Sequence, residues 1–380
     1  MVLILRHLEK TETYLMDKPV SLELNQNEVE LIIGNSNSNF SGVTSTMLQV
    51  LPYQEKLMKL KVMGNKHHLP DPSLYISFWQ AIKIARQPLS NGKVRIFHAR
   101  RVDEMIQALL LKYVFGAKFK VIFSSAAQRK RSKFTLWLTR QMDAVIAMCK
   151  TSATYLENPP STVIYHGINI NTFSPAEDKL QTWETVKFPG KPSKVSKHGI
   201  AILGRVRKQK GVHLFVDACI EVFKSNPDYT AIIVGLVATS HKGFVAQLTE
   251  KINKAGLTDR IVFTGEQDFR DIPNIFSSLS LVAALSDNEG FGLTALEAMS
   301  SGAAVLTTDA GAWPEVIRND VDGYVVPVND LQAVTNKLER LLGDHERLLQ
   351  MGINGRKNIE DNFTVEREAK ELCLFFSSLQ

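Results

Sequence analysis

The 380-residue sequence contains only three cysteines, Cys149, Cys219 and Cys373, and their spacing matches no known motif. An odd number of scattered cysteines fits a reducing compartment and argues against both a disulfide framework and a zinc site. No run of about 18 apolar residues occurs, so the sequence predicts no membrane span. The N-terminus has no signal-peptide pattern, and residues 1–27 receive no assignment.

The composition that remains is that of a soluble globular protein, with 44% hydrophobic and 22% charged residues. The length suits two domains. The net charge is +6, and the excess is concentrated in an acid-free segment, residues 117–140. Such a segment can attract nucleic acid, a phosphorylated substrate or an anionic membrane, or can simply be a solvated helix face. Nucleic acid is not expected, because no recognition motif or aromatic stacking pattern occurs.

Short apolar runs alternate with helical stretches along both halves of the chain, which predicts parallel sheets covered on both faces. We expect a helix over 44–59, a polar linker over 175–199, and strands at 29–34, 93–97, 119–123, 144–148, 161–165, 199–204, 229–235, 260–265, 280–285, 304–308 and 323–326. The predicted fold is α/β, with two doubly wound Rossmann-like domains: 1–175, on the acceptor side, and 176–361, which binds the donor. We expect the C-terminal helix, 362–380, to rejoin the first domain. Ligands of such sheets bind beyond the carboxyl ends of the strands, here in the interdomain cleft.

A basic loop, GRVRKQKG from Gly204 to Gly211, follows the first strand of the second domain and precedes a helix that begins near Val212. A helix N-terminus offers free amides and a partial positive charge. Arg205 can hold two phosphate oxygens, and Lys210 adds a point charge. The order of residues excludes a Walker A loop. The loop is therefore a candidate phosphate site, and an exposed basic turn is the alternative.

A second stretch, SDNEGFGLTALEAM over 286–299, sets Glu289 and Glu297 on either side of Gly290 and Gly292. The glycines let the backbone approach a ligand closely, and carboxylates accept hydrogen bonds well from sugar hydroxyls. Together with the basic loop, the pattern suits a nucleotide sugar. Alone, it is explained equally well by capping and structural roles.

These motifs resemble those of the retaining glycosyltransferases of family 4, which have the GT-B fold. Residues 289–299 are similar to the E-x7-E signature, and Gly204-Arg205, Lys210-Gly211, Phe263-Thr264-Gly265, Gly302, Gly311 and Pro314-Glu315 follow the family's order. Two features depart from it: Leu285-Ser286 stands where Pro-Ser is usual, and Gly42 is a single glycine in place of a pair. Segments 40–46, 97–101, 124–129 and 165–169 resemble a narrower group, the lipopolysaccharide core mannosyltransferases that act on Kdo.

The resemblance implies roles for individual residues. Arg205 and Lys210 would bind the donor diphosphate and stabilise the leaving nucleotide, while Glu289 would hold the transferred hexose and Glu297 the ribose. His98 would contact the donor sugar, or be a buried histidine satisfied by backbone. The remaining donor-binding candidates are Gly42, Gly204, Gly290, Phe291, Gly292, Leu293 and Thr294. Candidates for an anionic acceptor are Arg100, Arg101, Arg129 and Lys130, although Asp103 and Glu104 could instead pair with the first two.

The expected reaction is transfer of mannose from GDP-mannose, with retention, onto an inner-core Kdo acceptor at the cytoplasmic face of a bacterial inner membrane. We expect no metal, because no D-x-D motif lies in a plausible loop, and no cofactor besides the donor. Two alternatives stay open: a UDP-hexose-dependent enzyme of the same family that acts on another glycan or lipid, and a non-catalytic nucleotide-sugar-binding protein.

Overall fold

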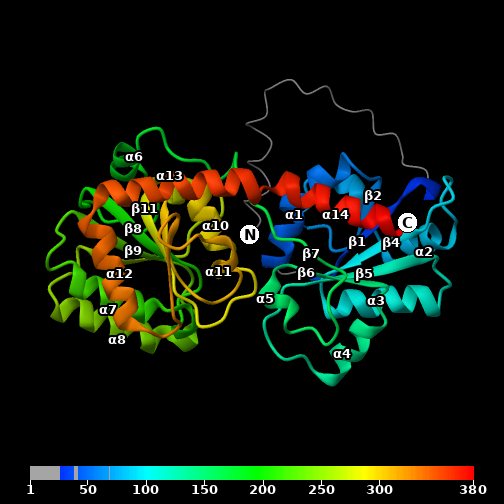
Figure 1. Ribbon diagram of the computed structural model, residues 1–380, viewed down its shortest axis with the longest axis horizontal. Coiled ribbons are helices and arrows are strands. Elements are labelled where there is room, and N and C mark those ends of the chain that lie inside the picture. Colours follow the sequence, from blue (N-terminus) through cyan, green and yellow to red (C-terminus); the bar gives the residue numbers. More distant parts are fainter. Residues whose placement is uncertain (1–25, 38–41, 68) are drawn as a thin grey trace.

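The computed structural model describes residues 26–37, 42–67 and 69–380 (Figure 1). Two parallel sheets form two lobes that lie side by side, with strand orders β3-β2-β1-β4-β5-β6-β7 and β10-β9-β8-β11-β12-β13. In both sheets the order reverses beside the first strand, which creates the switch point where Rossmann-like folds bind ligands. The predicted fold class is therefore confirmed.

The N-terminal lobe is built on the seven-stranded sheet. Its strands are β1 (Leu31–Asn35), β2 (Leu60–Gly64), β3 (Tyr75–Ile76), β4 (Arg95–Ala99), β5 (Phe119–Ser125), β6 (Ala144–Ala147) and β7 (Thr162–Val163). Its helices are α1 (Gly42–Glu55), α2 (Phe78–Arg86), α3 (Val102–Tyr113), α4 (Lys133–Arg140) and α5 (Lys150–Ala153). Buried residues of α2, α3 and α4 pack on one face of the sheet, and those of α1 on the other.

The sequence-based assignment of this lobe needs two corrections. The helix expected over 44–59 runs from Gly42 to Glu55, and the strands β2 and β3 were not expected. β2 offers only five residues, of which Leu60, Val62 and Met63 are buried, and β3 only two. Such short outer strands carry too little periodicity to separate them from the end of a helix. Of the segment 40–46, Phe40 and Ser41 lie outside the described residues.

The C-terminal lobe follows its predicted strands to within a few residues, because all of its strands but the half-buried edge strand, residues 261–265, are buried, largely apolar runs. The strands are β8 (His198–Leu203), β9 (Tyr229–Val234), β10 (Ile261–Gly265), β11 (Leu279–Ala284), β12 (Ala304–Thr308) and β13 (Gly323–Val326). The helices are α7 (Val212–Val222), α8 (Lys242–Lys254), α9 (Ile272–Ser278), α10 (Leu293–Ser300), α11 (Trp313–Val316), α12 (Leu331–Gly343) and α13 (His345–Asn362).

The segment 175–199, expected to be a linker, contains a packed helix, α6 (Lys179–Thr185). Its Trp183 is buried, and the indole Nε1 donates to the Ser196 carbonyl at 3.0 Å. The Lys179 ammonium donates to the carbonyls of Ser277, Leu279 and Ser301. Trp183 and Lys179 attach the segment to the C-terminal lobe. The sequence did not predict this helix, because the segment is mostly polar.

The last helix, α14 (Val365–Leu379), continues from the end of α13 across to the N-terminal lobe and packs against α1 (Figure 1). The crossing is held where Ile168 bridges Thr364 and where the Gly167 amide donates to Glu368 at 2.7 Å. A Cβ on Gly167 would lie 2.1 Å from the Thr364 carbonyl oxygen, so only glycine fits there. No helix in the described parts of the chain is long and apolar enough to cross a membrane.

Candidate active site

The basic loop lies directly beside the glycine-rich stretch at the carboxyl edge of the C-terminal sheet. Gly204 (φ 131°) turns the chain out of β8, and Gly211 (φ 70°) turns it into α7. A Cβ on Gly211 would meet the Leu285 carbonyl oxygen at 2.1 Å, so this close approach requires glycine. The Asp287 amide donates to the Gln209 carbonyl at 2.9 Å and fastens the two loops together. Arg205 is exposed at the tip of the loop.

The glycine-rich stretch ends at the start of α10. Gly292 has φ 90° and caps the helix, and its carbonyl accepts a hydrogen bond from the Trp313 indole at 2.8 Å. A Cβ there would lie 2.4 Å from the Trp313 Nε1 atom. The amides of Leu293 and Thr294 belong to the first turn, which has no partners within the helix. They are suited to an anionic or sugar oxygen, because a helix N-terminus favours negative charge.

Lys210 and Glu289, predicted to hold different parts of the donor, form an ion pair with each other. The Ser286 hydroxyl donates to the same Glu289 oxygen at 3.2 Å. Both charged side chains stay about one-fifth exposed, at 23% and 22%. The sequence does not reveal this pairing, which spans 79 residues. It fixes both groups at one point of the site.

Glu297 stands on α10 with its side chain partly exposed, and its carboxyl forms no hydrogen bond within the described residues. Desolvation raises the pKa of its carboxyl to about 7. A carboxyl that lacks partners and is costly to charge gains strongly from ligand hydroxyl donors. The position therefore suits recognition of a diol such as a ribose.

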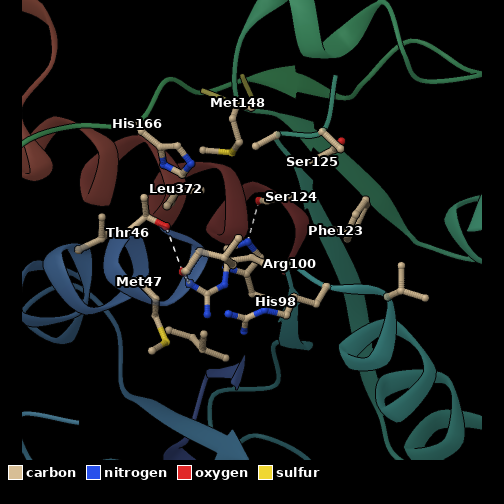
Figure 2. Close-up of a pocket in the computed structure, with 18 of the residues that line it drawn as sticks. Thr46, Met47, His98, Arg100, Phe123, Ser124, Ser125, Met148, His166 and Leu372 are labelled. Carbon is tan, nitrogen blue, oxygen red and sulfur yellow. Dashed lines mark hydrogen bonds between the residues drawn. The ribbon is translucent and has the colours of Figure 1, made fainter. Parts of the chain in front are cut away.

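A cavity of about 720 Å³ lies in the N-terminal lobe, at the carboxyl ends of β1, β4 and β5 (Figure 2). His98 and Arg100, from the end of β4 and the loop that follows it, point into this region together with His166 from the end of β7. Apolar side chains such as Met47, Phe123 and Leu372 complete the wall. The cavity thus combines apolar walls with several basic groups.

His98 is a buried, neutral member of this cavity. Its Nε2 atom lies 2.7 Å from the Ser124 hydroxyl, and its ring packs 5.0 Å from the Phe376 ring of α14. Desolvation lowers its pKa well below the usual value, and the charges of Arg100 and His166 add to this. His98 can therefore exchange hydrogen bonds with a substrate at neutral pH, but it carries no charge.

The four acceptor candidates all line the same cavity: Arg100, Arg101, Arg129 and Lys130. Arg101 is also ion-paired with Glu104 at 3.0 Å, as its neighbours in the sequence suggested. The Arg100 guanidinium donates to the Gly34 carbonyl at 2.9 Å. Arg129 and Lys130 are exposed and form no ion pair within the described residues. The exposed positive charge of the cavity that has no ion-pair partner within the described residues is thus that of Arg129 and Lys130.

The two halves of the site meet directly. Gly290 lines the cavity, and its carbonyl accepts a hydrogen bond from the Gln128 amide at 2.9 Å. Asn288 donates back to the Gln128 carbonyl at 3.1 Å, and the Phe291 ring lies 5.0 Å from the His166 ring. The predicted donor loop therefore forms part of the wall of the cavity in the N-terminal lobe.

Comparison with known proteins identifies the family. The model of the glycosyl transferases group 1 matches residues 185–358. The lipopolysaccharide core biosynthesis mannosyltransferase LpsB of Rhizobium meliloti (strain 1021) is 37% identical over 355 residues, which cover 93% of this chain and 98% of LpsB. The chain is a group 1 glycosyltransferase. LpcC of Rhizobium leguminosarum bv. viciae, with the same descriptive name, is 38% identical and covers 93% of the chain and 97% of its own length.

Solved structures agree on the fold of this glycosyltransferase. The structure of Anabaena HepE in complex with UDP superposes with a TM-score of 0.76, at 19% identity, over 92% of this chain and all of its own. The apo form of the lipopolysaccharide outer core galactosyltransferase WaaB gives a TM-score of 0.64 at 16% identity, over 91% of this chain and 98% of its own. The GT-B fold expected from the motifs is thereby confirmed.

Several residues of the glycosyltransferase site escaped the sequence-based prediction. His166 lies in the segment 165–169 that carried the resemblance, but it received no role; its Nδ1 atom lies 2.8 Å from Glu368 of α14. Glu368 has no motif around it, and only the returning helix brings it to the cavity. Gly42, expected in a loop near the diphosphate, is the exposed first residue of α1.

Glu315 joins the two lobes of the glycosyltransferase next to the site. Its carboxylate accepts hydrogen bonds from the amides of Lys150 and Thr151 at 2.8 and 2.7 Å, and from the Tyr165 hydroxyl at 2.7 Å. Burial raises the pKa of this carboxyl, but the hydrogen bonds outweigh burial and the net pKa is lowered. Glu315 stays ionised at neutral pH and holds the lobes in register.

Proposed function

We propose that the enzyme transfers mannose from GDP-mannose, with retention of configuration, to a Kdo residue of the lipopolysaccharide inner core. The observation that carries the proposal is the cavity lined by Arg129 and Lys130, whose wall includes Gly290 of the donor loop. An anionic sugar in this cavity would lie against the donor. Two relatives that align over 93% of the chain bear the name of lipopolysaccharide core mannosyltransferases, which supports the choice of sugar and acceptor.

The chemistry follows from the charges around the donor loops. Breaking the bond between sugar and phosphate leaves negative charge on the departing diphosphate. Lys210, which is held by its ion pair with Glu289, and the first amides of α10, which are fixed by the helix, would stabilise that charge. Arg205, exposed in the same basic loop, would add a further cation. These cations supply what a divalent metal would supply elsewhere, so we propose transfer without a metal. The two glutamates act in binding: Glu289 toward the hexose and Glu297 toward the ribose.

The proposed acceptor is a lipid-linked glycan, and we therefore propose that the enzyme works at the cytoplasmic face of the bacterial inner membrane. The acid-free segment 117–140, for which an anionic membrane was one of the open alternatives, is the candidate for docking there. Three of its seven cations are engaged within the protein: Lys120 donates to the Leu379 carbonyl, Arg131 to the Ser125 hydroxyl, and Arg140 pairs with Glu157. The other four, Lys118, Arg129, Lys130 and Lys133, are exposed and have no ion-pair partner within the described residues, so they carry the proposed attraction.

The deciding experiment is turnover with a panel of GDP- and UDP-sugars on Kdo-lipid A, with the product linkage determined by NMR. We expect GDP-mannose to be the one donor of the panel that is turned over, with release of GDP and formation of an α-linked product. Chelation with EDTA should leave the rate unchanged. Release of UDP and not GDP would establish the UDP-hexose alternative. Tight binding of a nucleotide sugar with no transfer to any acceptor would establish a non-catalytic binding protein.

Replacing both exposed cations of the cavity should weaken acceptor binding selectively. In Arg129→Ala/Lys130→Ala we expect the KM for a water-soluble Kdo acceptor to rise about tenfold, while the KM for the donor stays unchanged. The control is Lys118→Ala, which removes an exposed cation of the same lobe that does not line the cavity. Equal effects of the two variants on the acceptor KM would contradict the placement of the acceptor.

A further inference from the structure

Beyond Asp103 in its first turn, the solvent-facing side of α3 is apolar, which is unusual for a surface helix. Ile106, Leu110 and Tyr113 follow one another at helical spacing, and their exposed fractions are 42%, 41% and 66%. The opposite side of the helix is already buried in the core through Met105, Ala108, Leu109 and Leu111. A surface helix normally turns polar side chains outward. The outer stripe of α3 therefore needs an explanation other than the core of this lobe.

Aromatic side chains extend this stripe on both sides. α4 packs beside α3 and exposes Phe134 and Trp137 at 54% and 50%, with their rings stacked at 6.0 Å. On the other side Trp79 is 68% exposed, and its ring lies 6.1 Å from Phe115 just beyond the end of α3. We call these residues the outer face: Trp79, Ile106, Leu110, Tyr113, Phe134 and Trp137. The outer face lies on the side of the sheet opposite to α1 and α14 (Figure 1).

The charges beside the outer face are predominantly positive. Arg129, Lys130 and Lys133 border α4, and none has an ion-pair partner within the described ranges. Lys112 and Arg140 are neutralised by Asp143 and Glu157. Exposed aromatic and aliphatic side chains beside unpaired cations match the boundary between headgroups and acyl chains of an anionic bilayer. A second copy of this chain would bring the same cations together and be repelled.

We propose that the outer face docks on an anionic lipid bilayer and inserts Phe134, Trp137 and the α3 stripe into the headgroup region. The surface is continuous with the cavity, because Val102 at the start of α3 and Thr135 of α4 line it. Docking would present a lipid-linked acceptor to the cavity, and this purpose rests on the proposed function. The binding of the outer face to lipid does not depend on that function. The aromatic pair supplies apolar burial, and the cations supply attraction to the lipid charge.

The test measures co-sedimentation of the full chain with vesicles that contain no acceptor. Wild-type protein should bind vesicles of phosphatidylcholine mixed with phosphatidylglycerol much more tightly than vesicles of phosphatidylcholine alone. Phe134→Ser/Trp137→Ser should weaken binding to the anionic vesicles by at least about tenfold. Lys133→Glu should weaken it about fivefold or more. The matched control is Ile353→Ser/Leu374→Ser, which removes two exposed apolar side chains from α13 and α14, and should bind as wild type does.

Activity assays separate docking from catalysis. Phe134→Ser/Trp137→Ser should keep wild-type turnover of a water-soluble acceptor and lose turnover of the same acceptor embedded in vesicles. If no acceptor is turned over but vesicle binding follows the expected order, the proposed function fails and the docking stands. Equal binding of the aromatic variant and the control would overturn the docking. A wild-type dimer in solution that this variant dissociates would also overturn it, by assigning the outer face to a second copy.

Discussion

Replacing Lys210 by alanine should lower kcat by about two to three orders of magnitude, with a much smaller change in the donor KM. The ammonium stands in the basic loop before α7, where the proposed mechanism puts the negative charge of the leaving diphosphate. An interaction that strengthens only as the bond breaks is lost from kcat and not from ground-state binding. The measurement is steady-state turnover with saturating donor and acceptor.

The ion pair with Glu289 gives this prediction a sharper form. If Lys210 served only to position Glu289, Lys210→Ala and Glu289→Gln would lower kcat equally. The double variant would then lower kcat no further than either single variant. If Lys210 also acts on the phosphate, Lys210→Ala should lower kcat more than Glu289→Gln does. Added methylammonium should then restore part of the rate lost in Lys210→Ala. Lys208→Ala is the matched control, because it removes an exposed cation of the same loop. Unaltered turnover of Lys210→Ala would remove the leaving-group role.

Glu297→Gln should weaken donor binding and at the same time stabilise the ligand-free protein at alkaline pH. Loss of a charged acceptor for two ribose hydroxyls should cost about 1.5–3 kcal/mol, or roughly 10- to 100-fold in the donor KM. In the ligand-free fold the ionised carboxylate is poorly solvated, which is why its pKa rises from 4.5 to about 7. Glutamine keeps the shape and removes that cost.

The sign of the stability effect is fixed by linkage. Between pH 4.5 and about 7 the folded carboxyl holds a proton that the unfolded chain has released, so wild-type stability falls as pH rises through this window. Above pH 7 this loss of folding stability is complete, and it lowers the free energy of unfolding of the wild type by about 1–3 kcal/mol. We therefore expect equal Tm values for wild type and Glu297→Gln near pH 4.5 and a higher Tm for the variant at pH 8. A variant that is less stable at pH 8 would contradict a poorly solvated carboxyl that has no partner.

The sequence predicted the C-terminal lobe better than the N-terminal lobe, for a physical reason. Strands such as 304–308 and 323–326 are continuous apolar runs, because helices cover both faces of the sheet, and their bounds agree with the structure. The edge strand 75–76 is too short to carry a pattern. The helix in segment 175–199 was concealed by polar composition, since two residues, Trp183 and Lys179, carry its packing.

The site shows the same division. Arg205, Lys210 and Glu289 could be selected because each lies in a loop that follows a strand, and Glu297 because it completes the motif on the next helix; the structure brings all four to one edge of one sheet. The pairing of Lys210 with Glu289 could not be foreseen, because it depends on how two loops pack. Glu368 could not be selected either, since its place beside His166 depends entirely on the path of the last helix.

The return of α14 to the N-terminal lobe determines at which stage of synthesis the cavity can be completed. Synthesis proceeds from the N-terminus, so the strands of the N-terminal lobe leave the ribosome long before α14 does. Until the final helix emerges, α1 lacks its packing partner and the cavity lacks the wall formed by Glu368 and Leu372. A nascent or C-terminally truncated chain lacks this part of the wall of the cavity to which we assign the acceptor. On the proposed function, acceptor binding would therefore begin only after the last residues are released.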